Sequence, residues 1–299
     1  THAYANQQAR GMVERFLKTA ASSKPQQPIS IVRTVQDLQH NLQCPNTLSV
    51  IIHFEGADPF PAIDYWEQFD QYYRLGMRSL GIVWSRHNAF GHGVPFAFPT
   101  SPATGPGLTD LGKKLVNVSN QYGVMLDVSH LTEKGFWDVV KLSFAPVFSS
   151  LSCVHSISPS SRNLTDEQLL AIRDSNGVVG INFCVAFLRE DGRNDPSTPL
   201  AQIVKHARHV VDLIGIDHVA LGSDFDGATI PNELKDVAGL PKLMNAFRAA
   251  GFSEAELHQI GTGNWLRVLG DTWKNEPCSS ATGNSESEEK ETAVSAISP

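Results

Sequence analysis

The sequence predicts an α/β protein built on a parallel sheet, and two observations support this. Short apolar runs, rich in β-branched residues, alternate along the chain with longer stretches whose apolar positions recur at helical spacing. No hairpin turn separates consecutive strands, so the connections must be crossovers, which helices provide in parallel sheets. Six strands are predicted, near residues 47–54, 77–84, 124–128, 146–150, 178–183 and 218–223.

The composition is that of a globular protein with a substantial core. The chain has 299 residues, of which 41% are hydrophobic and 18% charged. Its net charge of -7 and scattered basic residues give no basic patch, so we expect no nucleic-acid partner. No apolar run reaches the roughly 18 residues of a transmembrane helix. We therefore expect a soluble protein, with the cytoplasm favoured as its location.

The four cysteines predict free thiols. Cys44, Cys153, Cys184 and Cys278 lie far apart and show no Cys-x-x-Cys spacing. This pattern is typical neither of a zinc ribbon nor of a disulfide framework.

The first part of the chain predicts two helices and a short strand before the first long strand. In chain order the elements are a helix at 5–20, a strand at 29–32, a helix to about 42, a strand at 47–54, a helix at 62–75 and a strand at 77–84. The loop 85–107 follows, and it is rich in Pro, Gly and Phe. Because long loops in compact domains are usually functional, we expect it to cover a site.

The second part continues the alternation of helices and strands. Thr109 and Thr165 each precede a predicted helix as N-cap residues. The expected helices are 109–123, 132–142, 166–175, 200–214, 240–250, 253–261 and 264–269. From Lys274 the sequence is rich in Ser, Glu and Ala without an apolar period, so 1–273 is predicted as the folded domain and 274–299 as a disordered acidic tail.

The number of strands leaves two architectures open. An eight-stranded barrel needs two strands more than the six predicted, and the C-terminal part of the chain is helical. A barrel would therefore be incomplete at its N-terminal side, with its first two strand units absent or reduced to the segment 29–32. A doubly wound open sheet is the alternative, although no Gly-x-Gly-x-x-Gly loop follows the first strand.

Residues suited to chemistry follow the predicted strands. Glu55, His130, Leu151 and Asp224 stand at strand ends, and Arg162 lies in the loop after the strand at 146–150. Catalytic groups gather at the C-terminal ends of strands in α/β barrels. Carboxylate and imidazole groups there suit a catalytic zinc site, in which a metal-bound water is activated.

Each of these residues also has a purely structural interpretation. Asp224 caps a turn in this interpretation, and His130 is a core histidine with local hydrogen bonds. Glu55 pairs with Arg78 or Arg86, and Arg162 lies on the surface before a helix. Their coincidence at one end of the sheet favours the functional interpretation.

Six motifs together resemble those of the membrane dipeptidase family, the zinc-dependent renal type, and most of all its soluble bacterial-type members. In order they are Phe54-Glu55-Gly56, Leu126-Asp127-Val128-Ser129-His130-Leu131, Ser161-Arg162-Asn163-Leu164-Thr165-Asp166, Gly177-Val178-Val179-Gly180-Ile181-Asn182-Phe183, Gly222-Ser223-Asp224-Phe225-Asp226-Gly227 and Gly263-Asn264-Trp265-Leu266-Arg267-Val268. The resemblance implies a TIM-type (β/α)8 barrel with a binuclear zinc centre. It also implies hydrolysis of the peptide bond of dipeptides through a metal-bound hydroxide.

The resemblance assigns a role to each candidate residue. It implies that Glu55 bridges two zinc ions and that His130 ligates one of them. Asp224 would exchange protons with the bridging hydroxide and the departing amine, and Arg162 would hold the substrate carboxylate. The implied partners are a dipeptide substrate and a second copy of the chain in a homodimer.

The sequence departs from the family pattern in two places. The family's N-terminal Asp-Gly-His-x-Asp motif does not occur in the 299 residues, and Leu151 stands where the family has a histidine. Of five expected metal ligands, Glu55 and His130 are left, and His155 would replace one only if its loop rearranged.

Two hypotheses follow from these departures. In the first, the chain is a dipeptidase whose first barrel strands precede Thr1. In the second, it is a degenerate homologue with a binding or vestigial role. An opened barrel would expose edge strands, so we also expect self-association.

Overall fold

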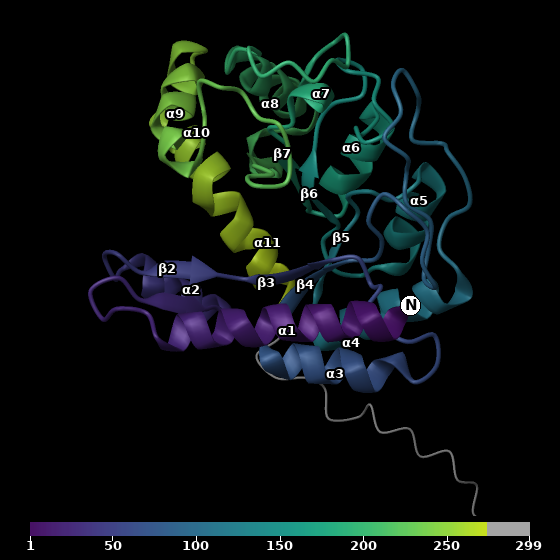
Figure 1. The fold of residues 1–299 in the computed structure, drawn as a ribbon. Helices are drawn as coiled ribbons and strands as arrows, with labels where there is room; N and C mark the ends of the chain where they lie inside the picture. The colour runs from purple at the N-terminus through teal and green to yellow at the C-terminus, as the bar shows by residue number, and fades with distance from the viewer. Residues whose placement is uncertain (274–299) are drawn as a thin grey trace, which may run out of the picture.

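Six parallel strands form the central sheet of the protein, and helices pack around it (Figure 1). The computed structural model describes residues 1–273. The strands follow each other in the sheet in the order of the chain, and every neighbouring pair is parallel. They are β3 (Ile52–Glu55), β4 (Met77–Gly81), β5 (Met125–Asp127), β6 (Phe148–Ser152), β7 (Val178–Ile181) and β8 (Val219–Leu221).

This topology confirms the α/β class and matches a partial barrel. A doubly wound sheet reverses its strand order at a switch point, whereas this sheet runs from β3 to β8 without reversal. Within residues 1–273, β3 and β8 each pair with one strand of this sheet. The two outer strands therefore present edges, and the expected self-association stays a prediction.

The predicted strand 47–54 is in fact two strands in different sheets. Its first half is β2 (Leu48–Val50), which pairs in parallel with β1 (Ile29–Ile31) in a separate two-stranded sheet. Its second half is β3, and the register of β3 on β4 shifts between Ile52 and His53. The chain passes from one sheet to the other between Val50 and Ile52, and the segment 29–32 belongs to the two-stranded sheet, so it does not replace a strand of the barrel.

The helices lie where the apolar periodicity placed them. They are α1 (His2–Ala21), α2 (Val35–Leu42), α3 (Tyr65–Leu75), α4 (Asp110–Tyr122), α5 (Glu133–Leu142), α6 (Asp166–Asp174), α8 (Ala201–Ile214), α9 (Leu240–Ala249), α10 (Glu254–His258) and α11 (Asn264–Thr272). Both predicted caps are confirmed. The Thr109 hydroxyl accepts a hydrogen bond from the amide of Gly112, and Thr165 forms a capping box with Gln168.

Three short helical segments were not predicted. They are α7 (Val185–Leu188) and the 3-10 turns η1 (Ile216–His218) and η2 (Val237–Gly239). Segments of this length are too short for an apolar period to show. The predicted helix 253–261 ends in the π-helical turn η3 (Gln259–Gly263), which joins α10 directly to α11 where the sequence predicted two separate helices.

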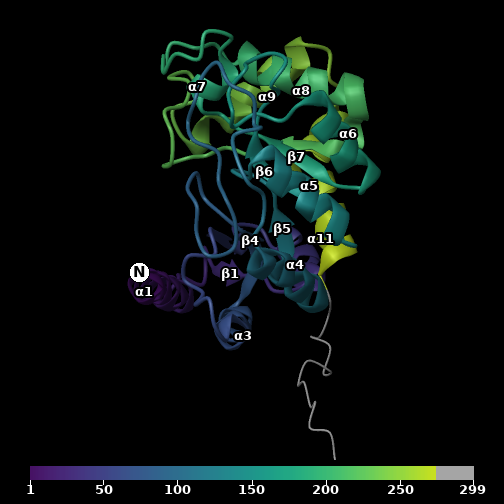
Figure 2. The ribbon, with the colours of Figure 1, turned by 90° about the vertical axis from the view of Figure 1, so that its right-hand side faces the viewer.

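The C-terminal helix α11 covers the N-terminal ends of the strands (Figure 2). Val268 and Leu269 of this helix belong to one buried apolar cluster with Met125, Phe148 and Val178, which stand at the first positions of β5, β6 and β7. Because one end of the sheet is closed by this packing, the opposite end, where the strands finish, is left for the polar residues.

Cys44, Cys153 and Cys184 are free thiols, as expected. Cys278 and the predicted acidic tail lie outside residues 1–273. Within that range no helix is long and apolar enough to cross a membrane.

Candidate functional site

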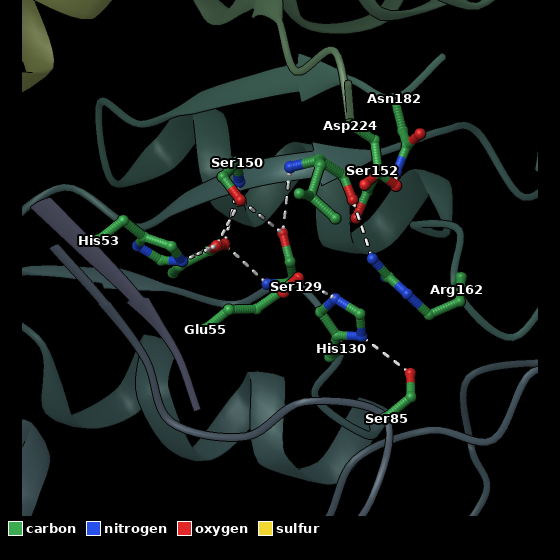
Figure 3. A network of polar contacts seen from close by, with 12 residues as sticks. His53, Glu55, Ser85, Ser129, His130, Ser150, Ser152, Arg162, Asn182 and Asp224 are labelled. Carbon is green, nitrogen blue, oxygen red and sulfur yellow. Dashed lines mark hydrogen bonds and ion pairs between the residues drawn. The ribbon is translucent and has the colours of Figure 1, made fainter. Parts of the chain in front are cut away.

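The C-terminal ends of the strands bring the predicted site residues together (Figure 3). Glu55 is the last residue of β3, and His130 follows β5 by three positions. Asp224 follows β8 by three positions, and Arg162 comes from the loop after β6. Because the strands are parallel and in chain order, residues far apart in the sequence meet at this edge.

His130 lies between two hydrogen-bonding partners (Figure 3). Its Nε2 is 2.9 Å from Oε1 of Glu55, and its Nδ1 is 2.8 Å from Oγ of Ser85. A carboxylate only accepts, so Nε2 carries the proton and Nδ1 accepts the Ser85 hydroxyl. Burial, followed by the nearby Arg162 charge, holds the pKa of His130 well below its usual range, so the imidazole is neutral.

Two site residues have strained backbones. The φ angle is 69° at His130 and 63° at Asp224, in the left-handed region that non-glycine residues rarely adopt. Strain of this kind persists where the surrounding structure enforces it, and it clusters at functional sites. Five other non-glycine residues within 1–273, Asp226 among them, also have a positive φ, so the contacts of His130 and Asp224 and not their backbones alone decide between the two interpretations.

Glu55 does not form the structural ion pairs that the sequence left open. Arg86 pairs with Asp58 instead, at 3.0 Å, and Arg78 donates to backbone carbonyls, including that of Arg33. Burial raises the pKa of Glu55, and the Asp127 carboxylate adds to this, whereas His53 and Arg162 lower it. Glu55 is therefore a carboxylate without a cationic side chain in contact.

Arg162 is buried, which rules out the surface interpretation. It is 3% exposed, and one guanidinium NH2 donates to the carbonyl oxygen of Leu151 at 3.0 Å. Its Nε is buried without a hydrogen-bond partner, and none of the ion pairs within residues 1–273 includes Arg162. Burial lowers the pKa of Arg162, while the carboxylates of Asp127, Asp224 and Glu55 raise it. A buried cation without a paired anion is costly, so this guanidinium is suited to an anionic ligand.

Asp224 is held by a residue that the sequence interpretation left out. Nδ2 of Asn182 donates to Oδ2 of Asp224 at 3.0 Å, and Oδ1 of Asn182 accepts from the amide of Cys184 at 2.6 Å. Burial raises the pKa of Asp224, the Asn182 hydrogen bond lowers it, and the Glu55 charge raises it again. The sequence feature that could have identified Asn182 as a site residue is its position directly after the apolar strand β7.

A second polar cluster inside the sheet was also missed. Asp127 is buried at the end of β5, where its Oδ1 accepts from the amides of Ser129 and Ser150, each at 2.9 Å. The Ser150 hydroxyl donates to Oδ2, and Nε2 of His53 lies 3.7 Å from the same atom. His53 is in turn 2.8 Å from Oγ of Ser79. The alternation of buried side chains in short strands carried too weak a signal to predict this cluster.

The long loop covers the site, as predicted. The amide of Val94 donates to the carbonyl of His130 at 2.8 Å, and Gly93 forms an antiparallel bridge with Leu131. The loop also exchanges hydrogen bonds with Ser161, next to Arg162: the Ser161 amide donates to the Ala97 carbonyl at 3.1 Å. The loop 85–107 is therefore hydrogen-bonded to the segments that follow β5 and β6.

The described residues do not fit a complete metal centre. Glu55 and His130 are in contact, but within residues 1–273 no group of three or more His, Cys, Asp or Glu side chains could hold a metal ion. Leu151 contributes no ligand, and Nε2 of His155 is 3.2 Å from the carbonyl oxygen of Thr100. Catalytic zinc sites use three protein ligands and a water.

Comparison with known proteins agrees with the resemblance to the membrane dipeptidase family. A sequence model of the family described as "Membrane dipeptidase (Peptidase family M19)" matches residues 5–281. A Klebsiella pneumoniae protein described as "Uncharacterized protein in pqqA 5'region" is 48% identical over 76% of this chain and 83% of its own length. "Dipeptidase aclJ" of Aspergillus oryzae is 31% identical over 80% of this chain and 55% of its own length.

A solved structure extends the similarity to the fold. It is a metallo peptidase from Rhodobacter sphaeroides liganded with a phosphinate mimic of the dipeptide L-Ala-D-Ala. The two chains superpose with a TM-score of 0.87 at 44% sequence identity, over 91% of this chain and 76% of the other. The similarity therefore covers most of both chains, in sequence and in fold.

The raised pKa of Asp224 predicts a pH-dependent gain in stability for Asp224→Asn. The folded state holds the Asp224 proton more tightly than the unfolded state, whose value is near 3.8. The wild type therefore loses stability as the pH rises from that value through the raised folded pKa, and the uncharged variant does not. We expect thermal melts at pH 7 to show a higher midpoint for Asp224→Asn than for wild type, and this difference to shrink as the pH falls toward 3.

The control for this prediction is Asp226→Asn, because Asp226 has the same φ of 63° but an exposed side chain. The Asp226→Asn variant measures how much stability asparagine adds, independently of pH, at a position with a left-handed backbone. A difference between Asp224→Asn and wild type that does not shrink toward pH 3 would contradict the assignment.

Proposed function

The chain belongs to the membrane dipeptidase family, peptidase family M19, a family of hydrolases that act on dipeptides, and on this premise we propose that its strand-end site binds a dipeptide for hydrolysis. One observation carries the proposal. The buried guanidinium of Arg162 faces the site without an ion pair among the described side chains, so the free carboxylate of a dipeptide is its natural partner.

Arg162 is held ready for a carboxylate. Its contact with the Leu151 carbonyl uses one NH2 group, and the ring of Phe187 lies 5.5 Å from its central carbon. Its Nε has no hydrogen-bond partner, so we assign this group to the ligand. A guanidinium with two parallel N–H donors matches a carboxylate in a bidentate pair. Burial makes this pair stronger than it would be in water.

Asp224 is proposed to carry the proton that peptide-bond cleavage requires. A departing amine must gain a proton, and a carboxyl group with a raised pKa supplies one more readily near neutral pH. Asn182 fixes the orientation of this carboxyl group through Oδ2 and leaves Oδ1 for the proton. The side chain is therefore oriented before any ligand binds.

Zinc is the metal that we propose for the site, with Glu55 and His130 as the residues that would hold it. The family implies a metal, and a bound metal would supply an activated water. The contact between the two side chains supports their assignment. Two ligands fall short of a complete centre, however, so the described residues alone do not account for tight zinc binding.

A second candidate function is dipeptide binding without hydrolysis. Leu151, at the end of β6, favours it, because an apolar side chain stands where the family pattern has a metal-binding histidine. Both candidate functions use Arg162 to bind the dipeptide carboxylate. They differ in whether a bound metal ion allows hydrolysis. A homodimer and a cytoplasmic location stay predictions from the resemblance and the composition.

Substitution of Arg162 tests the carboxylate site. We expect Arg162→Met to weaken dipeptide binding by about 10- to 100-fold, the range of a charge-assisted hydrogen bond to a buried group. Isothermal titration of glycyl-phenylalanine and of its C-terminal amide separates this role from a general loss of structure. Wild type should prefer the acid over the amide, and the variant should bind both equally weakly.

Arg86→Met is the matched control, because Arg86 is an exposed arginine paired with Asp58. It should keep the preference for the acid. If wild type binds the amide as well as the acid, Arg162 does not hold the carboxylate.

Zinc titration separates the two candidate functions. After dialysis we expect less than one zinc per chain and no hydrolysis of glycyl-phenylalanine, with activity appearing only when zinc is well above the chain concentration. Leu151→His, which adds an imidazole at the end of β6, should increase the zinc retained through dialysis.

Wild-type chain that keeps one zinc or more and hydrolyses dipeptides after dialysis would show that the metal centre is complete. Dipeptide binding without hydrolysis at any zinc concentration would instead support the second candidate.

A further inference from the structure

A row of aromatic rings borders the strand-end site on the side of the long loop. The ring of Phe96 lies 5.4 Å from that of Trp84, 6.0 Å from that of Phe187 and 6.5 Å from that of His130, between centroids. Phe187 in turn lies beside the guanidinium of Arg162. The row therefore extends from the proposed metal-binding histidine to the proposed carboxylate-binding arginine.

Phe96 is the most exposed ring of this row. It is 58% exposed, although hydrogen bonds hold the loop on both sides of it. Two residues before it, the Val94 amide donates to the His130 carbonyl, and one residue after it, the Ala97 amide donates to Oγ of Ser161 at 3.2 Å. An apolar ring held in water by its flanking backbone is preorganised to cover an apolar group of a ligand.

The position of Arg162 decides which part of a dipeptide meets Phe96. If Arg162 holds the carboxylate, the C-terminal residue of the ligand lies next to Arg162. Phe187 flanks the guanidinium and Phe96 packs on Phe187, so the side chain of that residue lies along these two rings. The peptide bond then lies toward His130 and Asp224.

The charges around the site act against acidic side chains. Glu55, Asp127 and Asp224 are carboxylates whose electrostatic influence reaches Arg162, and each raises its pKa. A second carboxylate on the ligand would be repelled by this group once Arg162 had bound the first. The rings and the charges therefore both favour a ligand whose C-terminal side chain is apolar.

We propose that Phe96 determines specificity and that the preferred ligands are dipeptides with an apolar, above all aromatic, C-terminal side chain. The inference rests on the proposed function, because it uses the Arg162 carboxylate site to orient the ligand. A ring-to-ring contact that becomes buried on binding is expected to strengthen binding by about tenfold.

Isothermal titration of the 299-residue chain with three dipeptides tests the proposal. Glycyl-phenylalanine should bind about tenfold more tightly than glycylglycine, and glycyl-glutamate should bind less tightly than both. In Phe96→Ala the ratio between the affinities for glycyl-phenylalanine and glycylglycine should fall to within about twofold. Phe96→Tyr should keep the ratio.

Ile63→Ala is the control, because Ile63 is another exposed apolar residue, 78% exposed, in the segment before α3. It should leave all three affinities unchanged. Equal affinities of wild type for glycyl-phenylalanine and glycylglycine would overturn the specificity role of Phe96, and so would an affinity ratio that is unchanged in Phe96→Ala. Either result would leave the proposed dipeptide binding intact. If none of the three dipeptides binds, the proposed function fails, and this inference fails with it.

Discussion

The structure depends on one constraint, the parallel arrangement of six strands in chain order. Each strand after β3 is reached by a crossover, so all six finish at the same edge of the sheet. The helix α11 packs against the beginnings of the strands and closes the opposite end. At the finishing edge Glu55, His130 and Asp224 lie together with the loop residue Arg162 (Figure 3).

The electrostatics of the site follow from this arrangement. The carboxylates of Asp127, Asp224 and Glu55 act on the buried guanidinium of Arg162, and burial favours the neutral forms of Glu55, Asp224 and Arg162. Glu55 accepts a hydrogen bond from His130, and Asp224 accepts one from Asn182. The arrangement leaves the guanidinium for an external anion and leaves Asp224 able to exchange a proton.

Much of the fold was predictable because its signals are local. An apolar run of four to six residues indicates a buried strand, and Thr109 and Thr165 mark helix starts through their hydroxyl groups. The division of the segment 47–54 between two sheets was not predictable, because it depends on which partner each half finds. The same reason hid Asp127 and His53, whose pairing across the sheet is a tertiary contact.

The sequence identified which residues form the site, but not how the structure arranges and supports them. The motifs gave Glu55, His130, Arg162 and Asp224, and the structure brings them to one edge. The burial of Arg162, the support of Asp224 by Asn182 and the exposed ring of Phe96 arise from loops whose paths no periodicity encodes. Leu151 was visible in the sequence, and the structure supplies no other group that completes the metal site within residues 1–273.

The role of Arg162 as the residue that receives the dipeptide carboxylate can be tested by a crystal structure of the chain with a phosphinate dipeptide mimic. We expect the C-terminal carboxylate of the mimic within hydrogen-bonding distance of the Arg162 guanidinium, with Nε now paired. A mimic bound at the strand ends with its carboxylate on another residue, and Nε of Arg162 still unpaired, would contradict it.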